Sequence, residues 1–141
     1  MTTQEKLNWI RKNFIDMIKS LPADTKGKWG VMNAQQMVEH MSYSVKQANG
    51  KDKRKLLTPD ELLERMRNFM LSDKQFKENT KNVELPDTAL PVQNPSMLHS
   101  VEELEAEIDL MVQHFDGNES KSEMNPFFGA MNYDEWVHLL H

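Results

Sequence analysis

The chain has 141 residues, with 22 acidic and 17 basic side chains, a net charge of −5 and no cysteine. Its length suits one domain around one core, so we expect a single domain over residues 1–141. The acidic balance argues against general nucleic-acid binding, and the lack of cysteine excludes disulfides, thiolate metal ligands and a cysteine nucleophile.

Five segments begin with the same helix-start signal, in which a capping residue is followed three positions later by Glu or Gln. These candidate caps are Thr2, Asn33, Thr58, Ser100 and Asn132. Apolar residues at helical spacing follow each cap, and no segment shows the sustained alternation of a strand. The sequence therefore predicts an all-α protein, with any strand pairing limited to the loops.

The apolar positions also predict which faces are buried. The first helix carries the stripe Leu7, Ile10, Phe14, Met17 and Leu21 and is expected to end before Pro22. The second is expected to run from Ala34 to Ala48 and to stop at Asn49-Gly50. The third, after Pro59, is shorter, and the fourth ends at Gly117.

Two long loops connect these helices. The stretch from Lys74 to Leu98 contains three prolines and no helical stripe, and we expect an extended strap. In the loop from Gly117 to Met131, we expect Phe127 and Phe128 to pack against one end of the helices.

Two charged stretches are expected to be solvated. The basic run from Lys51 to Lys55 is interpreted as a solvated loop, and the glutamates of "VEELEAEIDL" as a solvated helix face. The chain has neither an N-terminal signal region nor an apolar run near the roughly 20 residues of a bilayer span. We therefore expect a cytoplasmic protein with no membrane partner.

Amphipathic helices of this length bury their stripes best as an up-and-down four-helix bundle. The predicted bundle has a long loop between the third and fourth helical segments and a short last helix. That last helix has about nine residues, or roughly 13 Å, and its partners are about twice as long. We therefore expect it to continue beyond His141, and we expect a homodimer to cover any apolar surface left exposed.

The five histidines are the candidate metal ligands, because the chain has no cysteine. His40 lies at the edge of the second helix's apolar stripe, where it could serve as a ligand or as a structural residue. His138 and His141 share one helix face, but such a pair also arises by chance. His99 is expected to pack or cap near Ser100, and His114 suits the end of a helix.

Other catalytic patterns are absent from the sequence. It contains no Gly-rich phosphate loop, no nucleophile elbow and no His-Glu-x-x-His motif. A carboxylate-bridged di-metal bundle also fits poorly, because it needs a Glu-x-x-His pair on each of two helices.

Three stretches, "KWGVMNAQQMVEHMSYSV", "NFMLSDKQFKENTKN" and "NPFFGAMNYDEWVHLLH", resemble a bacterial branch of unknown function in the DinB-like superfamily. The similarity runs from Trp29 to His141, with the segments in matching order and spacing. It implies a four-helix bundle of the kind regarded as a metalloenzyme. Some relatives in that superfamily are transferases that use a low-molecular-weight thiol.

The resemblance also implies a three-histidine site for nickel, zinc or a similar divalent ion. His40, in "MVEHM", matches the ligand from the second helix. The other two ligands of the family lie in a His-rich stretch beyond "EWVHLLH", which is absent from this chain, and His138 and His141 do not match them. We expect His40 to face a groove near the N-terminal part of the last helix.

Three functions fit these observations. The first is a metal-dependent DinB-like protein, a transferase or hydrolase on an unidentified small molecule, with an incomplete metal site in this chain. The second is a non-catalytic helical binding or assembly protein that keeps the scaffold without the metal. The third is a metal-free bundle that binds a small apolar ligand among its 11 methionines and its aromatic side chains.

Overall fold

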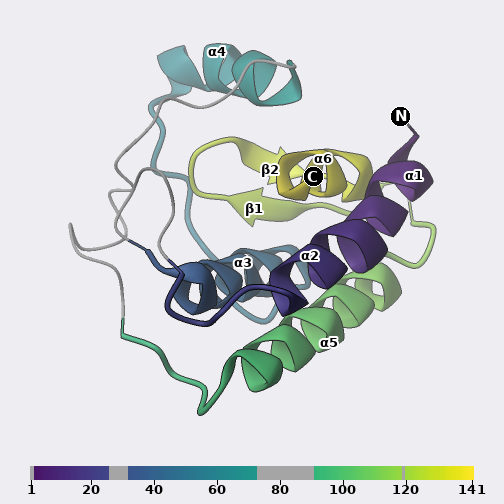
Figure 1. Ribbon diagram of the computed structural model, residues 1–141. Coiled ribbons are helices and arrows are strands. Elements are labelled where there is room, and N and C mark those ends of the chain that lie inside the picture. Colours follow the sequence, from purple (N-terminus) through teal and green to yellow (C-terminus); the bar gives the residue numbers. More distant parts are fainter. Residues whose placement is uncertain (1, 26–31, 73–90, 119) are drawn as a thin grey trace.

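Helix dominates the computed structural model, which describes residues 2–25, 32–72, 91–118 and 120–141 (Figure 1). The helical segments are α1 (Thr3–Asn8), the π-helical η1 (Trp9–Phe14), α2 (Ile15–Lys19), α3 (Ala34–Ala48), α4 (Asp60–Leu71), α5 (Met97–Phe115) and α6 (Tyr133–Leu140). Strands β1 (Glu123–Asn125) and β2 (Gly129–Met131) form a small antiparallel hairpin. The predicted helical character is confirmed, and the hairpin falls in the second predicted loop.

Three of the five predicted helix starts are confirmed. The side chains of Thr2, Asn33 and Asn132 each accept a backbone N–H three residues ahead. At Asn33 and Asn132, the Gln36 and Glu135 side chains reach back to the cap and complete the capping box. The sequence therefore set the beginnings of α1, α3 and α6 correctly.

The other two predicted caps are wrong. Helix α5 begins one turn earlier, where Ser96 accepts the N–H of His99, and Ser100 lies fully buried inside the helix. Helix α4 starts after Pro59 without a side-chain cap, because the Thr58 hydroxyl donates to the Phe127 carbonyl at 2.7 Å instead. In both cases a tertiary contact uses the side chain that local spacing assigned to the cap.

The first helix contains a π-helical turn, and this turn moves its buried face by one residue. The wider i→i+5 turn accommodates the stacked rings of Trp9 and Phe14, whose centroids are 5.9 Å apart. The buried apolar positions are consequently Leu7, Ile10, Ile15 and Ile18. The predicted stripe is wrong beyond Ile10, since Phe14 is partly exposed, Met17 is 52% exposed and Leu21 is 37% exposed.

Contacts along the helices give their relative directions. Helices α3 and α5 are parallel, because Gln35 contacts Ser100 and Asn49 contacts Glu107. The first helix runs antiparallel to α5, as the ion pairs Arg11–Asp109 and Lys19–Glu105 show.

Helix α6 is parallel to α1, since Thr3 contacts Asp134 and Lys6 contacts His138. Helix α4 in turn is parallel to α6, since Arg67 contacts Glu135 and Met70 contacts His138. Consecutive helices therefore alternate in direction, but the packed partners are distant in sequence (Figure 1).

The core draws on the first helix, α3, α5, α6 and the hairpin, and α4 adds Met70. Trp136 of α6 is fully buried and donates its indole N–H to the Glu123 carbonyl at 3.3 Å. Phe128 is buried in the core and Phe127 packs against it, as predicted for this loop.

Helix α4 lies at the edge of this core, against the hairpin and α6 (Figure 1). Within α4 the buried position is Met70. Arg67 donates to the carbonyls of Phe128 and Ala130 and pairs with Glu135. Gly129 has φ +84°, and a Cβ there would lie 3.3 Å from the Leu63 side chain, so this turn needs glycine to let α4 approach.

Two further predictions concern the strap and the membrane. Residues 73–90 of the strap lie outside the described residues, residues 91–96 are not helical, and Met97 and Leu98 already belong to α5. None of the described helices combines the length and apolar character needed to cross a bilayer.

The shifted face of the first helix can be tested with two neighbouring substitutions. We expect Ile15→Ala to lower the free energy of unfolding by about 2–4 kcal/mol, because it empties a fully buried site. Met17→Ala should cost less than about 1 kcal/mol, because this side chain is half exposed. Urea unfolding of both variants measures the difference, and a larger loss for Met17→Ala would contradict the π-helical shift.

Candidate functional site

His40, the predicted metal ligand, lies on α3 in a partly buried position. Its ring stacks on Tyr43 with centroids 6.3 Å apart and an interplanar angle of 21°. Burial lowers the pKa of His40 below its ordinary value, so the imidazole is uncharged near neutral pH. Neither ring nitrogen has a hydrogen-bond partner among the described residues. Such an imidazole can serve as a metal ligand.

The environment of His40 agrees only in part with the predicted groove. Its partial burial fits a position away from bulk solvent. In the part of the chain that the structure describes, however, no hydrogen bond or ring contact joins His40 to α6. The nearness of His40 to the last helix therefore stays a prediction.

His99 and His114 each have a polar neighbour. The Ser96 hydroxyl lies 2.6 Å from Nδ1 of His99, which is exposed at the start of α5. His114 Nε2 lies 3.1 Å from Glu123 Oε2 and ties the end of α5 to the hairpin. These contacts give both rings structural roles, close to those predicted for them.

His138 joins three helices. Its Nε2 donates to the Met70 carbonyl of α4 at 2.9 Å, because a carbonyl can only accept. In the neutral ring Nδ1 is then the acceptor, and it lies 2.8 Å from Lys6 Nζ of α1. His141 packs edge-on against Trp9 with centroids 5.2 Å apart. Both nitrogens of His138 are therefore engaged, and the pair does not present two open imidazoles to one ion.

The described residues contain no group of three or more His, Asp or Glu side chains arranged to hold a metal ion. Of the predicted three-histidine site, only His40 among the described residues has the properties of a metal ligand. Its imidazole is uncharged and has no polar partner in the described part of the chain. The other four histidines lie on α5, on α6 and at the residue after α6, and they do not join His40. The described donor set does not complete a three-histidine site, and no catalytic step follows from it.

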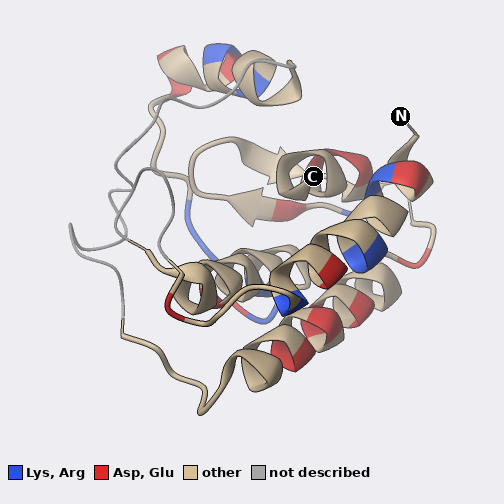
Figure 2. Ribbon diagram, in the orientation of Figure 1, with Lys and Arg blue, Asp and Glu red and all other residues tan. Residues whose placement is uncertain are grey.

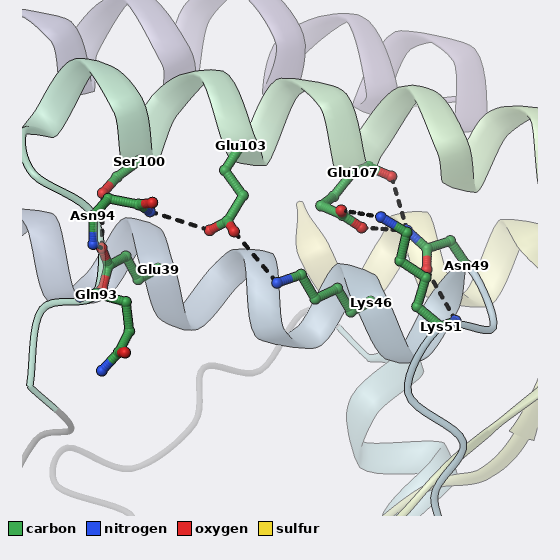
Figure 3. Close-up of polar contacts among 9 residues, drawn as sticks. All are labelled: Glu39, Lys46, Asn49, Lys51, Gln93, Asn94, Ser100, Glu103 and Glu107. Carbon is green, nitrogen blue, oxygen red and sulfur yellow. Dashed lines mark hydrogen bonds and ion pairs between the residues drawn. The ribbon is translucent and has the colours of Figure 1, made fainter.

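A row of polar contacts runs between α3 and α5, and it includes Glu39, the residue before His40; we call this row the α3–α5 seam (Figure 3). Its members on α3 and just after it are Gln35, Glu39, Lys46, Asn49 and Lys51, and its members on α5 and just before it are Gln93, Asn94, Ser100, Glu103 and Glu107.

Glu39 fastens the segment before α5 to α3. Its carboxylate accepts the backbone N–H groups of Gln93 and Asn94 at 2.8 and 2.9 Å and the Ser100 hydroxyl at 2.9 Å. Burial would raise the pKa of Glu39, but these hydrogen bonds together outweigh burial and lower it. The charged carboxylate therefore acts as a structural clamp.

At the other end of the seam, the Glu107 side chain is 5% exposed, and the positive charge of Lys51 balances its carboxylate. It accepts from Asn49 Nδ2 at 2.8 Å and Lys51 Nζ at 2.5 Å, and Glu103 pairs with Lys46 at 3.3 Å. Burial by itself would raise the pKa of Glu107. The hydrogen bonds and positive charges around it outweigh burial, so its pKa is lowered. The prediction of a fully solvated glutamate face is wrong at Glu107. The sequence signal for its burial is its position three residues after Leu104, which places both side chains on the same face of α5.

The basic run is also more than a solvated loop. Besides Lys51, which pairs with Glu107, Lys53 lies 2.8 Å from the buried Glu123 carboxylate of β1. Arg54 lies above the Tyr43 ring at 5.1 Å and pairs with Asp52. Figure 2 shows further acidic positions along α5 and both signs of charge along the first helix. Lys51 and Lys53 thus neutralise carboxylates that α5 and the hairpin bury.

One buried polar group in the described chain lacks a partner. Ser42 Oγ is buried and makes no hydrogen bond there. Ser42 lies seven residues after Gln35 and seven before Asn49, so all three share the face of α3 that meets α5. Gln35 reaches Ser100 and Asn49 reaches Glu107, whereas Ser42 faces the layer between them without a partner.

Comparisons with protein-family models, with curated proteins and with solved structures found no match to this chain.

The seam can be tested with a matched pair of serine substitutions. We expect Ser100→Ala to lower the free energy of unfolding by about 1–3 kcal/mol, because Gln35, Asn94 and Glu39 lose a shared partner. Ser42→Ala should leave stability unchanged or raise it by up to about 1 kcal/mol, because it removes an unpaired hydroxyl. Chemical denaturation compares the two, and an equal loss in both variants would mean that Ser42 has a partner.

The lowered pKa of His40 predicts a pH dependence of stability. Below the ordinary histidine pKa of about 6.5, the unfolded chain binds more protons than the folded one, so stability falls as pH drops. The pKa of His141 is also lowered, by burial and by the nearby Lys6 and His138. Because His141 is exposed, solvent screens these charges and its contribution to the pH dependence of stability is small. We expect His40→Gln to flatten the loss between about pH 7 and pH 5 in urea titrations.

A second loss should follow at lower pH, where Glu39, Glu107 and Glu123 have lowered pKa values. Their contribution is present above the unfolded carboxyl pKa and is lost as pH falls through the folded one. An identical slope for His40→Gln and the unaltered chain between about pH 7 and pH 5 would contradict the assignment to His40.

Proposed function

We propose that this chain is a divalent-metal-binding protein with a DinB-like four-helix bundle, in which His40 supplies one imidazole ligand. The metal is nickel, zinc or a similar ion, and its chemistry would be that of a Lewis acid that polarises a bound group or lowers its pKa. Its substrate is a small molecule that the described residues do not identify.

The arrangement of the helices supports the bundle. The first helix, α3, α5 and α6 all bury side chains in one core. In it α3 and α5 run parallel to each other, and the first helix and α6 run in the opposite direction. We assign these four to the bundle and treat α4 as an added helix on the hairpin and α6. These four are the three long helices and the short last helix that the sequence pattern predicts for the bundle.

The observation that carries the metal proposal is the contrast between His40 and the other histidines. His99, His114 and His138 each have a polar neighbour at their rings, and His141 packs on Trp9. His40 is the partly buried, uncharged ring without a polar partner among the described residues. A transition-metal ligand must be neutral and accessible at one nitrogen, and the lowered pKa of His40 meets the first requirement.

A single imidazole gives weak binding, because stable sites use three or four ligands. The homodimer and the cytoplasmic location stay predictions from the sequence. A scaffold without the metal remains the competing function, and the following experiment separates the two.

The test is paramagnetic broadening of the histidine ring resonances by Ni²⁺ in untagged protein. We expect the His40 signals to broaden at the lowest Ni²⁺ concentration and binding to be weak by calorimetry. His40→Ala should weaken binding by at least about tenfold, about 1.4 kcal/mol. His99→Ala is the matched control, since it removes an exposed imidazole on α5 and should leave affinity unchanged.

Broadening that starts at His138 or His141, or equal affinity with and without His40, would contradict the proposal. That result would favour the metal-free scaffold.

A further inference from the structure

We infer that the outer face of the first helix and α5 is the surface on which a second copy of this chain docks. The two helices lie side by side and antiparallel (Figure 1). This inference goes beyond the proposed function and depends neither on a metal nor on His40, which lies on α3. It names the interface of the homodimer that the sequence predicts.

Helix α5 turns a stripe of acidic side chains toward solvent on this face. Glu102, Glu105 and Asp109 are spaced by three and four residues, which places them on one side of the helix. Glu102 is exposed, and its side chain has no polar partner in the described chain. Figure 2 shows the acidic positions as red bands along α5. This side of α5 is therefore negatively charged.

The first helix is mainly basic on the same face, over η1 and α2. Its exposed charged side chains there are Arg11, Lys12, Asp16 and Lys19. Asp16 reduces the positive charge but leaves an excess of cations, and Lys12 has no polar side-chain partner among the described residues. The face thus carries a basic ridge beside an acidic ridge, and such a surface can complement a second copy of itself.

Two ion pairs within the chain show which levels along the two helices correspond. Arg11 pairs with Asp109 at 2.6 Å, and Lys19 pairs with Glu105 at 3.5 Å. A twofold axis parallel to the helices keeps each residue at its own level and places the first helix of one copy opposite α5 of the other. Each cation then meets a carboxylate at its own level. The four side chains of these ion pairs are still 39–62% exposed, so they are accessible to a second partner.

Apolar side chains on both helices supply further surface for the contact. Leu98 of α5 is 58% exposed and Met17 of α2 is 52% exposed, and these are the two most exposed large apolar side chains in the described chain. A groove of about 290 Å³ between the helices is lined by Arg11, Ile15, Glu105, Ile108 and Asp109. Covering this face removes apolar surface from water, and the two charged ridges select a chain with the matching pattern.

The first experiment reverses the charge of one ridge at a time in the full chain. The acidic variant combines Lys12→Glu with Lys19→Glu, and the basic variant combines Glu102→Lys with Glu105→Lys. Each variant loses the Lys19–Glu105 ion pair, which is solvent-exposed and contributes little to stability, so both are expected to fold. Analytical ultracentrifugation measures the mass and the Kd of the dimer, and circular dichroism checks folding.

We expect the unaltered chain to form a dimer that weakens as the salt concentration rises. Each variant alone should raise the Kd by at least about tenfold, because like charges then face one another. An equimolar mixture of the two variants should form a heterodimer, since each ridge again meets the opposite charge. Repair of an ion pair within one chain does not explain that result, because positions 19 and 105 carry the same sign in each variant.

The second experiment tests the apolar part of the face with a matched pair of substitutions. Met17→Asp should raise the Kd by at least about tenfold, because the interface would bury an unpaired carboxylate. Leu62→Asp is the control, since Leu62 is 42% exposed on α4, away from this face, and its Kd should stay unchanged.

A monomer at every protein concentration would overturn the inference. Failure of the acidic and basic variants to combine would overturn the charge pairing across the interface. A dimer that is lost with Leu62→Asp and kept with Met17→Asp would place the contact on α4 and would equally overturn it.

Discussion

The parallel packing of α3 on α5 is the constraint on which the rest of the structure depends. Buried polar pairs occur at both ends of this contact, Gln35 with Ser100 and Asn49 with Glu107. Sliding one helix along the other would leave these groups buried without partners, at a cost that an apolar interface would not impose. The pairs therefore set the register of α3 against α5 and, through it, the shape of the core.

This register also determines which charges can serve as structural ties. Because Glu39 and Glu107 face the seam, their carboxylates are occupied by backbone N–H groups, Ser100, Asn49 and Lys51. Glu39, the one acidic side chain of α3, is thus committed to holding the segment before α5 in place. His40 is left on the flank of the same helix, where Tyr43 is its ring contact.

The short helix α6 is held by side chains of two other helices as well as by its own apolar face. Trp136 fills the core, Lys6 and Met70 both bind His138, and Arg67 pairs with Glu135. These contacts explain how eight helical residues stay ordered, since an isolated helix of that length is unstable in water. They also explain why His138 is a structural residue despite its spacing from His141.

The sequence by itself determined the helical character and three of the helix caps. These features depend on local spacing, in which a cap and its third neighbour, or a stripe of apolar residues, interact within one helix. Only the tertiary structure decided the caps at Ser96 and Pro59, the π-helical turn, the buried Glu107 and the engagement of His138. Each of these depends on a partner distant in sequence or on a one-residue change in helix geometry. The regular 3.6-residue period used to read the sequence gives no information about either.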